Sequence, residues 1–83
     1  MKTLIELNYE ITKKRGLITH NTSMDEFVEK LKEEVLEFIN SSDFDKPYEL
    51  ADIILVCFNI AKHFNVDIEK RLLSNLTKNI NRC

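Results

Sequence analysis

The sequence predicts an all-α fold built from four helices. Apolar side chains recur at helical spacing in four segments, whereas the sustained alternation and hairpin turn dipeptides typical of strands are absent. The chain contains a single Gly and a single Pro, so it is neither disordered nor loop-rich. With 83 residues it is long enough for one small domain, which we expect to span residues 1–83.

The first two helices are identified by residues that stop and start them. A helix is predicted over residues 2–15, and Gly16 supplies its C-terminal stop. After a loop at 17–22, Ser23 begins the second helix, and Glu26 completes a capping box three residues later. The apolar face of the first helix comprises Leu4, Leu7 and Ile11. The apolar stripe of the second comprises Phe27, Val28, Leu31, Val35, Phe38 and Ile39.

The remaining two helices follow a short polar loop that contains Ser41, Ser42, Asp43 and Asp45. Pro47 lies where the first turn of a helix tolerates proline. This third helix should run to about Phe64, with Asn65 as a left-handed terminator. Asp67 then caps a fourth helix. The apolar residues of that helix recur every four positions and are Ile68, Leu72, Leu76 and Ile80.

Composition and charge exclude several classes of function. The net charge of −2 provides no basic field to attract nucleic acid. The N-terminal segment lacks the long apolar core and cleavage site of a signal peptide, and the apolar run at 50–61 is too short to span a bilayer. We therefore expect neither nucleic acid nor a membrane as a partner. Cys57 and Cys83 have no local spacing motif, which favours a reducing, cytoplasmic setting.

The third helix is apolar on nearly every side. From Leu50 to Ala61, every residue except Asp52 and Asn59 is apolar. Glu49 and His63 fall with these two polar residues into one arc about 80° wide. A helix that is apolar around the rest of its circumference needs neighbours on all sides. In a chain this short, a second subunit is the natural supplier, so we expect a homodimer or homotetramer.

Two groups of acidic residues on successive helices predict a metal site. Asp52 follows Glu49 by three residues, and burying it in an apolar run is costly unless a cation meets it. Antiparallel packing would bring Glu34 and Glu37 of the second helix opposite this pair. Four converging carboxylates suit a hard divalent cation such as Mg²⁺. Glu33 points more toward solvent.

Structural explanations for these acidic residues remain open. The glutamates of the second helix are interspersed with Lys30 and Lys32, as on an ordinary solvated helix face. Asp52 would have a structural role if it formed a buried salt bridge, for which Lys78 and Arg82 are the candidate partners. His63 near the end of its helix is more typical of a side chain that complements the helix dipole than of a substrate contact.

The acidic pattern resembles the signature of the MazG-like all-α nucleoside triphosphate pyrophosphohydrolases. The sequence reads EEVLE from Glu33 to Glu37, then eleven residues, then ELAD from Glu49 to Asp52. The tail NLTKNINR is similar to the KxxKNxxR ending of that family, and the similarity covers about residues 23–82. The first lysine of this tail pattern is replaced by Asn75.

The resemblance implies a fold, an activity and a set of site residues. It implies a four-helix MazG-like bundle completed by homo-oligomerisation. The implied activity cleaves a nucleoside triphosphate between the α- and β-phosphates, with Mg²⁺, or alternatively Mn²⁺, as the cofactor. The implied metal ligands are Glu34, Glu37, Glu49 and Asp52. Catalytic roles would fall to Glu33, Glu34 and Glu37, and substrate-binding roles to Lys78, Asn79 and Arg82.

Two other functions stay open on the sequence. Phosphoribosyl-ATP pyrophosphohydrolase shares the fold and ELAD-like residues, although the KNxxR tail argues against it. A non-catalytic helical oligomer or regulatory module with a relic metal site is favoured by Asn75, which removes one expected phosphate-neutralising charge.

Overall fold

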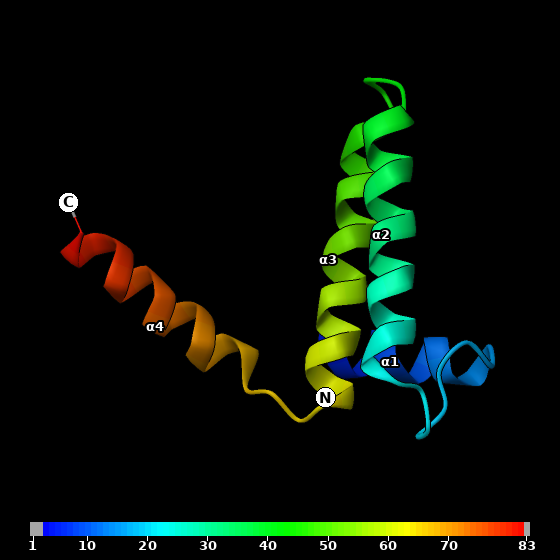
Figure 1. Cartoon of the computed structure of the whole chain (residues 1–83), viewed down its shortest axis with the longest axis horizontal. Helices are drawn as coiled ribbons and strands as arrows, with labels where there is room; N and C mark the ends of the chain where they lie inside the picture. The colour runs from blue at the N-terminus through cyan, green and yellow to red at the C-terminus, as the bar shows by residue number, and fades with distance from the viewer. Residues whose placement is uncertain (1–2, 83) are drawn as a thin grey trace.

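The computed structural model describes residues 3–82, and every regular element within that range is an α-helix (Figure 1). The prediction of an all-α fold with four helices is therefore confirmed for these residues. The predicted first helix began at residue 2, which lies outside the described range. The helices are α1 (Leu4–Lys14), α2 (Met24–Asn40), α3 (Lys46–His63) and α4 (Ile68–Asn81).

Local capping sets most of the helix ends as the sequence predicts. The Ser23 hydroxyl accepts a hydrogen bond from the Glu26 backbone N–H, and the Glu26 carboxylate accepts one from the Ser23 N–H. Pro47 lies in the first turn of α3. Asn65 has a φ of 57°, the left-handed conformation that ends α3. The Asp67 carboxylate accepts a hydrogen bond from the Lys70 N–H and so begins α4.

Helices α2 and α3 form an antiparallel hairpin, and α1 packs against α3 near the end of the hairpin that lies away from the α2–α3 loop (Figure 1). The core is small. Ile18, Phe27 and Ala61 are its buried apolar residues, each 4% exposed. The aromatic ring of Phe27 packs against the rings of His63 and Phe64. The core thus gathers the start of α2, the end of α3 and the α1–α2 loop.

Helix α4 extends away from the other three helices (Figure 1). All of its residues except Ile68 are exposed. Completion of a four-helix bundle by a second copy of the chain therefore stays a prediction. Across residues 3–82, the structure contains no helix with both the length and the apolar character that a membrane crossing requires.

Candidate metal centre

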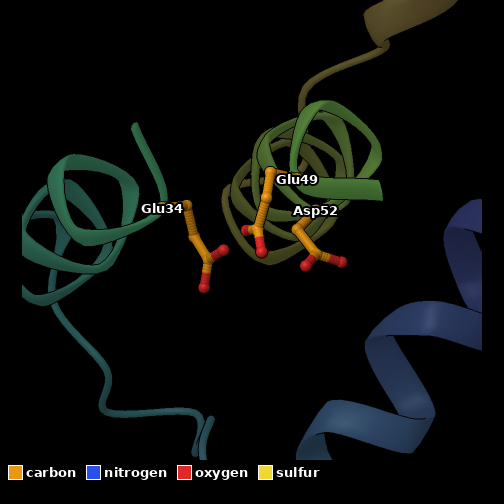
Figure 2. A group of neighbouring side chains, drawn as sticks. All are labelled: Glu34, Glu49 and Asp52. Atoms are coloured by element: carbon orange, nitrogen blue, oxygen red, sulfur yellow. The ribbon is translucent and has the colours of Figure 1, made fainter. Parts of the chain in front are cut away.

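Three carboxylates gather where α2 faces the first turns of α3. Glu34, Glu49 and Asp52 each offer an oxygen, and these oxygens all lie within 4.8 Å of one another. Figure 2 shows Glu34 reaching from α2 toward the two carboxylates that α3 presents. The three-residue spacing places Glu49 and Asp52 on one side of α3, and the hairpin places Glu34 opposite them. The arrangement supplies oxygen ligands at the separation suited to one divalent cation.

Two oxygens in this group are buried and have no hydrogen-bond partner. They are Oε2 of Glu34 and Oε2 of Glu49. The Glu34 side chain is only 9% exposed, and its other oxygen, Oε1, lies 3.0 Å from Nζ of Lys30. Leaving a buried carboxylate oxygen unpaired is costly because no water or donor replaces its lost hydration. A cation placed between Glu34 and Glu49 would offset that cost, so the donor set fits a hard metal ion.

The other two predicted acidic residues lie at the edge of this group. Glu37 is exposed, one turn beyond Glu34, and its carboxylate is not among the three that gather. The charge of Glu34 is the main cause that raises the pKa of Glu37, with desolvation and the charge of Glu49 adding to it. The Glu37 carboxyl group is therefore close enough to the cluster for its pKa to respond to the charges of Glu34 and Glu49. Glu33 is also exposed, and its carboxylate lies 3.9 Å from Nζ of Lys30.

A cleft of about 770 Å³ opens beside the carboxylates. Glu33, Glu34 and Asp52 contribute to its wall, together with the cationic side chains of Arg15 and Lys30. Its other polar lining residues include Asn8, Thr12 and Asn59. A cleft lined by carboxylates, cations and amides suits a ligand that brings phosphate groups and a metal ion together.

The sequence did not predict the residues that α1 and the following turn contribute to the cleft. Asn8, Thr12 and Arg15 belong to α1 and the turn that follows it, and nothing in their local spacing marks them as neighbours of Asp52. The one available signal was Asn59, which shares the polar arc of α3 with Asp52 and contacts both Asn8 and Thr12. Lys30, for which an ordinary solvated helix face was one open explanation, is half exposed and lines the cleft.

His63 holds structural elements together. Its Nε2 lies 2.9 Å from the Thr22 carbonyl oxygen, and its Nδ1 lies 2.8 Å from the Tyr9 hydroxyl. Because a carbonyl only accepts, Nε2 must donate, and in the neutral imidazole the Tyr9 hydroxyl donates to Nδ1. His63 thus links α1, α3 and the α1–α2 loop, a structural role other than the dipole interaction expected from the sequence.

The tail residues predicted to bind substrate lie on one face of α4. Lys78, Asn79 and Arg82 line a shallow depression of about 230 Å³ together with Asn75. They do not line the cleft beside the carboxylates. Asp52 forms no ion pair with Lys78 or Arg82 within the described residues, so the structural salt bridge considered for it does not form.

Comparison of the chain with protein-family models, curated proteins and solved structures gave no match. The resemblance to the MazG-like enzymes thus rests on the motif residues themselves. What the structure adds is geometric: three of the four predicted ligands lie together beside a cleft that also presents cationic side chains.

Proposed function

We propose that this protein is a Mg²⁺-dependent nucleoside triphosphate pyrophosphohydrolase, which releases a nucleoside monophosphate and pyrophosphate. The observation that carries the proposal is the pair of buried, unpartnered oxygens of Glu34 and Glu49 beside Asp52. A folded protein retains such an electrostatically unfavourable group when a ligand satisfies it. The acidic motif and its spacing give the ligand class, a hard divalent cation.

Different residues of the chain would have different roles in the proposed reaction. Glu34, Glu49 and Asp52 would hold the metal, with Glu37 joining them after a change of side-chain conformation. When bound, Mg²⁺ or Mn²⁺ neutralises phosphate charge and lowers the pKa of a bound water. Glu33 is exposed at the cleft and would accept a proton from the attacking water. Arg15 and Lys30 bring positive charge to the cleft wall for the phosphate groups.

A second copy of the chain would cover the exposed apolar residues of α4. Four apolar residues of α4 are between 52% and 72% exposed, namely Leu72, Leu73, Leu76 and Ile80. Covering them with a second copy would bury this stripe and allow α4 to approach another chain's cleft. In such a homodimer or homotetramer, Lys78, Asn79 and Arg82 would bind the triphosphate.

Pyrophosphate release tests the proposal. A panel of nucleoside triphosphates that includes phosphoribosyl-ATP is incubated with the protein, with and without Mg²⁺. We expect metal-dependent turnover, and we expect Asp52→Asn to lower kcat/KM by more than roughly 100-fold, since it removes a metal ligand. Asp43→Asn, in the exposed α2–α3 loop, is the matched control and should retain full activity.

A non-catalytic helical oligomer or regulatory module with a relic metal site is the second candidate. It is favoured by the distance in the fold between the carboxylates and the basic face of α4, and by Asn75 on that face. Calorimetry distinguishes the two. The absence of both turnover and magnesium-dependent nucleotide binding across the panel would replace the hydrolase proposal with this one.

A further inference from the structure

Lys30 occupies a position between the metal centre and the cleft. It lies on α2 one turn before Glu34, with its Nζ 3.0 Å from Oε1 of Glu34 and 3.9 Å from Oε2 of Glu33. Its side chain is 50% exposed and lines the cleft beside Asp52. The ammonium group therefore contacts a carboxylate expected to bind metal and also faces the space expected to hold substrate.

This ion pair conflicts with a metal ion at the same carboxylate. The ammonium group approaches one oxygen of Glu34 while the other oxygen remains unpartnered. A divalent cation bound to Glu34 and Glu49 would repel an ammonium group held within a few Å of it. Lysine has a long flexible stem and a compact charge with three donors, so it can leave one anion for another.

We propose that Lys30 is an exchangeable counterion, which neutralises Glu34 in the metal-free protein and moves to a phosphate group of the substrate when the metal binds. The proposal rests on the proposed function, because it takes the metal and the phosphate ligand from it. Lys30 would then bind substrate, and the pair seen here is its resting position. The cleft offers the room for this movement.

The same helix supplies a matched control. Lys32 forms an ion pair of similar length with Glu29, 3.3 Å between Nζ and Oε1, and both side chains are exposed. Neither residue lines the cleft. An exposed pair of this kind contributes little to stability, so Lys32→Met removes a helix lysine without touching the site. Lys30→Met keeps most of the apolar stem and removes the charge.

The first measurement is Mn²⁺ affinity without nucleotide, by calorimetry. The Lys30→Met variant should bind Mn²⁺ roughly three- to tenfold more tightly than the unsubstituted protein, because it no longer has a cation that competes for Glu34. Lys32→Met should match the unsubstituted protein, and Lys30→Arg, which keeps the charge, should not tighten binding. Equal or weaker Mn²⁺ binding by a folded Lys30→Met variant, verified by circular dichroism, would overturn the exchange.

The second measurement is binding of the magnesium complex of inorganic triphosphate, a probe that requires no knowledge of the base. Lys30→Met should weaken it about tenfold, consistent with loss of a charge-assisted contact, and Lys32→Met should not. Unchanged triphosphate binding would overturn the phosphate-binding role.

The two proposals fail in different ways. If the protein is not a hydrolase, turnover is absent while Lys30→Met still tightens Mn²⁺ binding. If Lys30 has no such role, turnover proceeds and Lys30→Met behaves like Lys32→Met in both measurements.

Discussion

At the residue scale, Glu37 is an exposed carboxyl group whose pKa responds to the acidic cluster. Its pKa is raised, mainly by the charge of Glu34 and then by desolvation and the charge of Glu49, while Lys30 opposes the shift. A raised carboxyl pKa means that the ionised form is less favourable in the folded chain than in the unfolded chain. The resulting destabilisation is fully present above the folded pKa and disappears below the ordinary value of 4.5.

Substitution of Glu37 should therefore stabilise the metal-free protein. We expect Glu37→Gln to raise the free energy of unfolding at neutral pH in the presence of a chelator. As the pH falls through the folded pKa of Glu37 toward 4.5, the difference from the unsubstituted protein should shrink to zero. Urea unfolding at several pH values measures this. Glu29→Gln, on the exposed face of α2, should give no such pH-dependent gain. A gain that grows toward acid pH would contradict the assignment.

Helix periodicity predicts which acidic residues share one side of a helix, but it does not predict how two helices pack against each other. The i,i+3 spacing fixes Glu49 and Asp52 on one side of α3 whatever the rest of the chain does. The approach of Glu34 required one further assumption, antiparallel packing across a short loop, which the structure confirms. Glu37 was expected in the same group, and whether its carboxylate joins the other three depends on a side-chain conformation that periodicity does not determine.

At the element scale, a buried amide network fixes α1 on α3. Asn59 is 6% exposed, and its Oδ1 accepts a hydrogen bond from Nδ2 of Asn8 at 2.8 Å. Its own Nδ2 donates to the Thr12 hydroxyl at 3.2 Å. Asn8 also donates to the Leu55 carbonyl. With so few buried apolar residues, the position of α1 depends strongly on these bonds.

Removal of the Asn59 side chain should loosen α1. We expect Asn59→Ala to lower the free energy of unfolding by about 1–3 kcal/mol, since Asn8 and Thr12 each lose a partner in a part-buried setting. Chemical denaturation measures the loss. Asn75→Ala, on exposed α4, is the control and should change stability by less than about 0.5 kcal/mol. Equal losses for the two variants would show that the network does not anchor α1.

Helix ends and helix docking differ in how far sequence predicts them. The capping box at Ser23, the Asp67 cap and the left-handed Asn65 are local, because each depends on residues no more than a few positions apart. All three are confirmed. The pairing of Asn8 with Asn59 joins residues 51 positions apart. No local rule links them, so the wall of the cleft formed by α1 could not be derived.

At the scale of the whole molecule, the single chain exposes more surface and is less compact than a folded monomer of its mass. Its accessible surface is 6792 Å², whereas a folded monomer of 9.8 kDa exposes about 5,200 Å². Its radius of gyration is 14.5 Å, against about 11.8 Å for a compact chain of this length. The excess of about 1,600 Å² per chain is what each subunit of an obligate homodimer buries. An excess of this size and the exposed apolar residues of α4 are what the proposed second copy would cover.

The stripe on α4 offers the sharpest test of that assembly. Leu76 lies at the centre of the stripe and is 60% exposed, so Leu76→Glu would place a charge where we expect the second copy to pack. Sedimentation velocity at micromolar concentration should show a dimer or tetramer for the unsubstituted chain and a monomer for Leu76→Glu. Ser74→Glu adds the same charge to the opposite side of the same helix and should leave the assembly intact. Because pyrophosphate release is proposed to need the basic face of α4 from another copy, Leu76→Glu should also lose activity at concentrations where the unsubstituted chain retains it. A monomeric unsubstituted chain with full activity would show that one chain suffices, and α4 would then have to fold back onto its own cleft.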